Sequence, residues 1–179
     1  RNIIDGKEAL SISGHYLPDK RTLDATASAT GFGLGFIEPF ISSLATDVSG
    51  SLTADARITG TLDTPEIFMI GGHLEQFCAK LDYTKVPYIL DGTIDMTPGK
   101  ITLRNFSVKD RETGTGTLRG VVTHRPFKDF NIDININADN LIGFDTNIQE
   151  NETFYGKAYA TGNVGISGPL STLALNIDV

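Results

Sequence analysis

The chain has 179 residues, of which 40% are hydrophobic, so it is long enough to form one domain with a hydrophobic core. Its net charge of −7 and the scattered positions of its Lys and Arg residues argue against nucleic-acid binding, which needs a basic patch. The longest apolar stretch is interrupted by Glu38 and Pro39 and is shorter than the roughly 20 residues of a membrane-spanning helix.

The chain begins at Arg1, without an initiator methionine or a signal-like segment. We therefore expect a single domain over residues 1–179 that is a piece of a longer chain. Its one cysteine, Cys78, excludes an internal disulfide and leaves the redox compartment open. We expect this thiol to be buried and inert.

The first third of the chain predicts a hairpin, a short helix and a longer strand. Apolar residues alternate with polar ones over 10–16 and again over 23–29, with a Pro-Asp-Lys turn between them. Apolar residues at helical spacing then predict a short helix near residues 34–45. The alternation resumes over 48–62, which indicates one long strand or two.

Four consecutive antiparallel strands are predicted between about residues 89 and 138. The clearest is 130–138, where apolar and polar residues alternate at every position, so that one side of the strand is apolar and the other polar. Pro98 and Gly99 are typical of a type II turn. Along the strand after this turn the apolar positions change from odd to even, which predicts a bulge near Asn105.

The remaining segments are less regular. We expect residues 139–153 to form a loop, and residues 74–86 stay open between strands and irregular structure. The strand pattern that ends near Gly60 returns near Gly168, which indicates an internal repeat.

The sequence contains no pattern of catalytic residues. His15, His73 and His124 lie in separate segments, without the spacing of metal ligands. The glycine-rich stretch 31–35 lacks the Lys and Ser/Thr of a phosphate-binding loop. We therefore predict that the chain is not an enzyme and that it has no metal site and no cofactor.

Several segments resemble the C-terminal domain of the TamB family, the periplasmic part of the translocation and assembly module of Gram-negative bacteria, which has AsmA-like, repeating β-groove relatives. The most specific is 154–170, Phe-Tyr-Gly-Lys-Ala-Tyr-Ala-Thr-Gly-Asn-Val-Gly-Ile-Ser-Gly-Pro-Leu, and the likeness covers most of the chain from about residue 34. Further matching segments are 49–65 (from Ser-Gly-Ser-Leu through Gly-Thr-Leu-Asp-Thr-Pro), 90–95 (Leu-Asp-Gly-Thr-Ile-Asp), 97–101, 106–110, 114–120 (Gly-Thr-Gly-Thr-Leu-Arg-Gly) and 124–129.

The resemblance implies an all-β fold in which an elongated, curled antiparallel sheet forms an open groove, or β-taco, with an apolar interior. It implies a periplasmic protein anchored in the inner membrane by a segment outside this chain. The implied function is phospholipid transport between the inner and outer membranes, together with outer-membrane protein assembly. The implied partners are phospholipid acyl chains and an outer-membrane barrel of the TamA type, and the family provides no catalytic residues.

Small residues recur on the apolar side of the predicted strands, as at Ala54, Ala56 and Gly162. A compact sandwich would fill this side with large residues, whereas small ones leave room for a guest chain. We therefore expect acyl chains to lie against Ile58, Leu118, Val122, Ile132, Ile134, Ile136, Ala158, Ala160, Val164 and Ile166.

Two alternatives stay open. The chain could be a chaperone-like module that adds a sheet edge to strands of unfolded outer-membrane proteins. It could also be a plain structural β-domain whose own side chains fill the core. A groove cut from a longer chain has exposed ends, which favour end-to-end self-association of the fragment.

Overall fold

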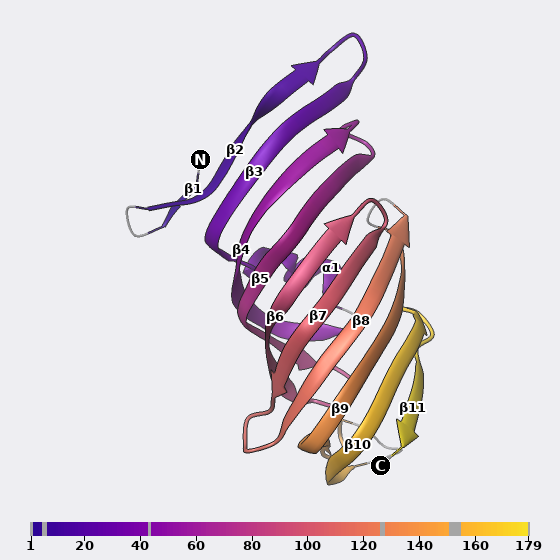
Figure 1. The fold of residues 1–179 in the computed structure, drawn as a ribbon. Coiled ribbons are helices and arrows are strands. Elements are labelled where there is room, and N and C mark those ends of the chain that lie inside the picture. The colour runs from indigo at the N-terminus through magenta and orange to yellow at the C-terminus, as the bar shows by residue number, and fades with distance from the viewer. Residues whose placement is uncertain (1, 5–6, 43, 126–127, 151–154, 179) are drawn as a thin grey trace.

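The computed structural model describes residues 2–4, 7–42, 44–125, 128–150 and 155–178. Within these residues, eleven strands form one antiparallel sheet whose spatial order follows the sequence, curled but not closed into a barrel (Figure 1). The strands are β1 (Asn2–Ile4), β2 (Lys7–Leu17), β3 (Thr22–Gly33), β4 (Ala45–Gly60), β5 (Pro65–Leu81), β6 (Pro87–Thr97), β7 (Lys100–Lys109), β8 (Thr115–Arg125), β9 (Lys128–Thr146), β10 (Gly156–Pro169) and β11 (Ala174–Asp178).

The connections between strands alternate between two ends of the sheet, because each strand is antiparallel to the one before it. The end that carries the connections after β2, β4, β6, β8 and β10 is called the upper end, as it lies in Figure 1. The connections after β3, β5, β7 and β9 lie at the opposite, lower end.

The predicted hairpin and the predicted four-strand meander are confirmed as β2–β3 and β6–β9. In β9 the side chains from Phe130 to Ala138 alternate between sheltered apolar positions and exposed polar ones. Asn105 has a φ of 52° and lies at a register shift between β7 and β8, so the predicted bulge is also confirmed.

The helical segment lies where it was predicted but is shorter than 34–45. A 3-10 turn, η1 (Gly35–Ile37), leads into the single-turn helix α1 (Glu38–Ile41). The carboxylate of Glu38 accepts a hydrogen bond of 2.7 Å from the backbone N–H of Val48, which ties the helix to β4. Because β4 already begins at Ala45, no residues remain for a longer helix.

The predicted loop over 139–153 is wrong for residues 139–146, which are strand, whereas residues 147–150 form a turn. β9 continues to Thr146, which pairs with Gly156 of β10, while residues 151–153 lie outside the described part of the chain. Asn140 has a φ of 53° and forms a bulge, after which both Leu141 and Ile142 are buried, so the alternation of 130–138 breaks off in the sequence.

Residues 74–86, left open above, belong mainly to β5, which runs to Leu81. β5 contains two irregularities, at Gly71 with a φ of 71° and at Gln76 with a φ of 49°. Each shifts the apolar positions by one residue, so the strand keeps its apolar side chains on one face although their spacing in the sequence changes.

Side chains of neighbouring strands satisfy the backbone at the bulges. A bulged residue is left out of the ladder, and its N–H is costly if it stays unpaired. Here threonine and aspartate oxygens of the next strand accept these hydrogen bonds, so the sheet can bend without losing them. Among the described residues the pairs are Gly31 N–H to Thr53 (3.0 Å), Gly71 to Asp95 (2.8 Å), Gln76 to Asp91 (2.7 Å) and Asn140 to Thr161 (2.9 Å).

The two glycines that mark the predicted repeat occupy equivalent positions. Gly60 at the end of β4 has a φ of 90° and Gly168 near the end of β10 a φ of 112°. A Cβ atom added at either glycine would meet the carbonyl oxygen of the residue four positions later, Thr64 at 2.6 Å or Thr172 at 2.9 Å. Both turns therefore require glycine for the same reason, which supports the repeat at this point.

Candidate functional site

The candidate site is the apolar face of the sheet, which is continuous from strand to strand. Residues that pair directly across neighbouring strands put their side chains on the same face. The register produces an unbroken row from β2 to β10: Ile12, Ala27, Ala56, Met69, Met96, Ile101, Val122, Ile132 and Gly168. A second row runs from β5 to β11: Gly72, Ile94, Leu103, Gly120, Ile134, Ile166 and Leu175.

The residues of these two rows carry no charge. Charged side chains lie on the opposite face, where Arg57 pairs with Asp24 and Arg104 with Asp95. A hydrocarbon chain placed along either row would therefore meet no group that loses hydration.

The lower part of the apolar face is filled by the protein itself. Phe106, Val108, Leu118, Ala138 and Leu141 are buried and form one cluster. Leu74 of β5 packs against the same cluster as Leu141 of β9, so the sheet curls towards its apolar side.

The ten predicted lining residues divide between this cluster and the rest of the apolar face. Leu118, Ile134 and Ile136 belong to the cluster or pack against it, so they line a filled region. The other seven are half-buried and are not among the cluster members: Ile58, Val122, Ile132, Ala158, Ala160, Val164 and Ile166.

Large apolar side chains are exposed where the rows reach the two margins of the sheet. Ile12 on β2 is 59% exposed, and Leu175 and Ile177 on β11 are 56% and 52% exposed. These side chains extend the apolar face beyond the part that the protein covers.

The upper end carries a pocket of about 320 Å³ where the apolar face meets the turns. Ile67 and Met96 contribute apolar walls, and His124 and Arg125 contribute polar groups. Burial lowers the pKa of His124, whose ring lies against Phe130, so burial favours the neutral form of this imidazole. The charged groups that line the pocket are therefore Glu66 and Arg125, which lie at the upper rim of the apolar face.

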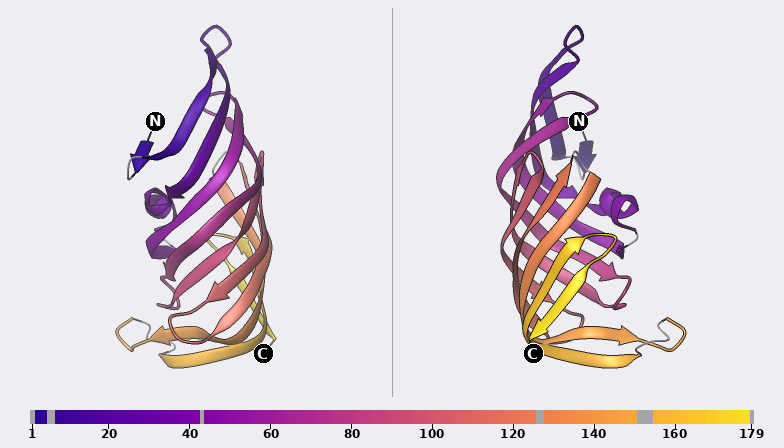
Figure 2. Two further views of the ribbon diagram at one scale, coloured as in Figure 1. Left: turned by 60° about the vertical axis from the view of Figure 1, so that its left-hand side comes forward. Right: turned by 90° about the vertical axis from the view of Figure 1, so that its right-hand side faces the viewer.

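The lower end is crossed by a structure that we call the end hairpin, residues 139–146 of β9 and 156–160 of β10. These segments leave the line of the sheet and lie across its lower end (Figure 2). The hydroxyl of Tyr88, at the start of β6, donates a hydrogen bond to the carbonyl oxygen of Ile142, and the backbone N–H of Asp145 donates to the carbonyl oxygen of Thr84 at 2.9 Å. The end hairpin thus contacts the β5–β6 connection.

Asp110 joins the end hairpin to the β7–β8 connection. Its buried carboxylate accepts hydrogen bonds from the backbone N–H groups of Glu112 (2.8 Å), Gly114 (3.0 Å) and Ile142 (2.8 Å). Ile142 is fully buried beside it. The carboxylate therefore fixes its own turn and the end hairpin together.

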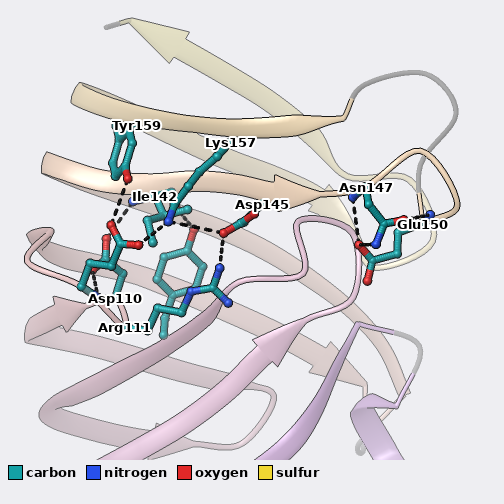
Figure 3. A network of polar contacts seen from close by, with 10 residues as sticks. Asp110, Arg111, Ile142, Asp145, Asn147, Glu150, Lys157 and Tyr159 are labelled. Atoms are coloured by element: carbon teal, nitrogen blue, oxygen red, sulfur yellow. Dashed lines mark hydrogen bonds and ion pairs between the residues drawn. The ribbon is translucent and has the colours of Figure 1, made fainter.

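A group of charged side chains surrounds this junction (Figure 3). Lys157 pairs with Glu112 and lies 3.5 Å from Asp145, while Arg111 pairs with Asp145. The hydroxyl of Tyr159 donates to Glu112 at 2.9 Å. The hydrogen bond with Lys157, and then the one with Tyr159, lowers the pKa of Glu112. The hydrogen bond with Glu112 raises the pKa of Lys157.

The sequence pattern did not reveal this junction, because Asp110 and Glu112 lie between segments predicted only as strands of the meander and Asp145 lies in a predicted loop. The available signal was the adjacent apolar pair Leu141 and Ile142, which is unusual in a solvent-exposed loop.

Cys78 was predicted to be buried, but the structure shows it only half-buried. Burial, and to a lesser degree the charge of Asp47, raises the pKa of its thiol, which lowers the fraction of reactive thiolate.

Over the ranges that the structure describes, no three His, Cys, Asp or Glu side chains are grouped as metal ligands, and no helix has the length and apolar character to cross a membrane. Comparison of the chain with protein-family models, with curated proteins and with solved structures found no match.

Proposed function

We propose that this chain is a hydrophobic-groove segment that shelters phospholipid acyl chains in the periplasm, in a TamB-like protein that moves phospholipids between the inner and outer membranes. The observation that carries the proposal is that the two uncharged apolar rows continue over β2 to β11, and that in the upper row Ile101, Val122 and Ile132 are only half-buried although Met69 is buried.

The energetic reason for such a surface is the cost of hydrating hydrocarbon. Each methylene group exposed to water costs about 0.8 kcal/mol, so an acyl chain of about 16 carbons costs roughly 12 kcal/mol in an aqueous gap. A continuous apolar face removes much of this cost, and it does so without a single tight binding point at which the lipid would stop.

The same protein is proposed to act in outer-membrane protein assembly, with an outer-membrane barrel of the TamA type as its partner and with its inner-membrane anchor outside this chain. The support for these parts is the sequence resemblance, of which residues 126, 127 and 154 lie outside the described part of the chain.

Photo-crosslinking tests the proposal with matched neighbours on the same strand. Crosslinkers in place of Ile166 and Ile12 should capture phospholipid, because both side chains belong to the apolar rows. Crosslinkers in place of Ser167 and Ser13, which point to the opposite face, are the controls and should not. Equal capture on the two faces would sink the proposal.

A second candidate is a chaperone-like module that captures unfolded outer-membrane protein strands by β-augmentation. It is favoured by β11, whose five residues are all exposed and which, within the described part of the chain, pairs with β10 alone. Substitution of Asn176 by Pro would remove a ladder N–H and should abolish peptide capture, whereas Ile132→Asp should not. The opposite pattern of effects would favour lipid binding.

A further inference from the structure

We infer that the end hairpin is a displaceable plug that closes the lower end of the groove, and that the charged contacts of Lys157 and Asp145 with the β7–β8 connection hold it closed. This inference rests on the proposed function, since a plug matters only if the apolar face holds a guest. It adds that hydrocarbon enters from the upper end and reaches the lower end only after the hairpin moves.

The first support is the position of the hairpin. β9 pairs with β8 only as far as Asp139, opposite Thr115, and beyond that residue it pairs with β10 alone. The free part then contacts the β5–β6 connection through Asp145 and the β7–β8 connection through Ile142. It therefore covers the lower end from β9 to β5.

The second support is a bend that both strands of the hairpin share. Asn140 in β9 has a φ of 53° and Gly162 in β10 a φ of 142°. The β9–β10 register shifts between Ala160 and Gly162, beside Asn140. The β9–β10 ladder is regular on the sheet side of this point, from Gly162 to Pro169. On the hairpin side the two strands stay paired as far as Gly156 and Thr146, with a second shift between Ala158 and Tyr159, so they can swing together about the bend.

The third support is the contrast between what the plug buries and what holds it. Leu141 packs into the apolar cluster and Ile142 is fully buried, so the closed arrangement dominates. The contacts of Lys157 and Asp145 are partly exposed ion pairs, which are individually weak. Opening also breaks the hydrogen bonds of Ile142 with Asp110 and Tyr88 and that of Asp145 with Thr84. None of these contacts belongs to the pairing between other strands, so the hairpin can move without unfolding the rest of the sheet.

A guest would compete directly with the plug. Leu141 belongs to the same cluster as Phe106, Val108 and Leu118, the side chains that an acyl chain descending the groove would meet next. Hydrocarbon that contacts these residues binds only the open arrangement, so binding there shifts the population towards it.

Thiol labelling without any lipid tests the plug itself. In a Cys78→Ser background, Ile142→Cys places a thiol on the buried side of the closed hairpin. The rate at which this thiol reacts with a maleimide reports how often the hairpin opens. Adding Lys157→Glu sets a negative charge beside Glu112 and Asp145 and should raise this rate about tenfold, the combined effect of a few exposed pairs. Adding Glu112→Lys to that variant restores an opposite charge beside residue 157, so the labelling rate should fall most of the way back to its value without Lys157→Glu.

A second thiol separates local opening from unfolding of the whole sheet. Met69→Cys, in the same Cys78→Ser background, lies buried in the row near the upper end and away from the hairpin. Its labelling rate should stay unchanged when Lys157→Glu is added. The inference is overturned if the Ile142→Cys rate does not rise, or if both thiols react faster together.

Salt offers the same test if Lys157→Glu does not fold. Raising NaCl to about 1 M screens exposed pairs and should speed labelling of Ile142→Cys but not of Met69→Cys. No acceleration at either thiol, or equal acceleration at both, overturns the inference.

Crosslinking then connects the plug to lipid. With phosphatidylethanolamine vesicles, a crosslinker in place of Val108 should capture lipid only when Lys157→Glu is present, whereas one in place of Ile166 should do so in both backgrounds. Capture at both positions without the substitution overturns the plug alone. Absence of capture at Ile166 overturns the proposed function. Whether the hairpin opens is then decided by the thiol-labelling rates alone, because those experiments contain no lipid.

Discussion

The lower and upper parts of the apolar face have the same alternating pattern and differ in what covers them. At the lower end Phe106, Val108 and Leu141 are almost completely buried and the end hairpin lies across the sheet. In the upper row Ile101, Val122 and Ile132 remain half-buried. Alternation thus determines which face is apolar, while long-range contacts determine whether the protein fills it.

The largest difference between the two parts should appear in stability. Phe106→Ala removes the centre of the lower cluster and should lower the free energy of unfolding by about 3–5 kcal/mol. Val122→Ala, in the half-buried upper row, should cost less than about 1.5 kcal/mol, because little packing is lost there. Denaturant unfolding of both variants gives the comparison, and equal losses would mean that the upper part is as well filled as the lower.

The buried carboxylate of Asp110 should have the next largest effect. Asp110→Ala leaves three backbone N–H groups without their acceptor and should cost about 2–4 kcal/mol. Asp63→Ala at the upper end removes only an exposed pair with Arg21 and should change stability by less than about 1 kcal/mol. Chemical unfolding measures both, and a small loss for Asp110→Ala would show that the junction is not a structural anchor.

Alkaline pH should weaken the lower end through Tyr88. Burial, and then the charge of Asp110, raises the pKa of Tyr88 from 10.0 to about 12. The folded state therefore favours the neutral form of Tyr88, and this contribution to the free energy of unfolding is complete below pH 10, the pKa of an unfolded tyrosine. As pH rises from 10 through 12 the contribution is lost, which lowers the free energy of unfolding by up to about 2–3 kcal/mol.

The comparison for this prediction is Tyr88→Phe, which cannot ionise. Its unfolding free energy should be lower near neutral pH, because the hydrogen bond to Ile142 is missing, and it should fall less between pH 10 and 12. Parallel pH curves for the two proteins would argue against a neutral Tyr88 at the lower end.

A charge on the upper part should affect stability least and lipid capture most. Ile166→Asp changes a half-buried side chain and should cost only about 1 kcal/mol. It should nevertheless reduce capture by a crosslinker in place of Ile132, because hydrocarbon would then lie against a carboxylate. Ser167→Asp, on the opposite face, should leave capture unchanged, and a matching loss in that control would remove the distinction between the faces.

Much of the sheet follows from local patterns. The alternation of 130–138, the turn at Pro98 and the change of parity near Asn105 each specify structure through residues adjacent in the chain. Each strand pairs with the next strand in the sequence, so the described part of the sheet contains no crossover connection of the kind that local patterns could not have predicted.

The lower end could not be predicted in the same way. The bulge at Asn140 hides the continuation of β9, because it changes which positions are sheltered. The role of Asp110 depends on Ile142, 32 residues later, and nothing in the sequence near Asp110 identifies that partner. The division of the ten lining residues between filled and half-buried regions depends on these contacts.

The sequential order of the strands has a consequence for folding. Since each strand pairs with its predecessor, hairpins can form early and the sheet can grow by adding one strand at a time, with short loops to close at every step. The hydrogen bond from Tyr88 to Ile142 closes a separation of 54 residues and must wait until the intervening strands are in place. The chain therefore completes its groove before it can shut one end of it.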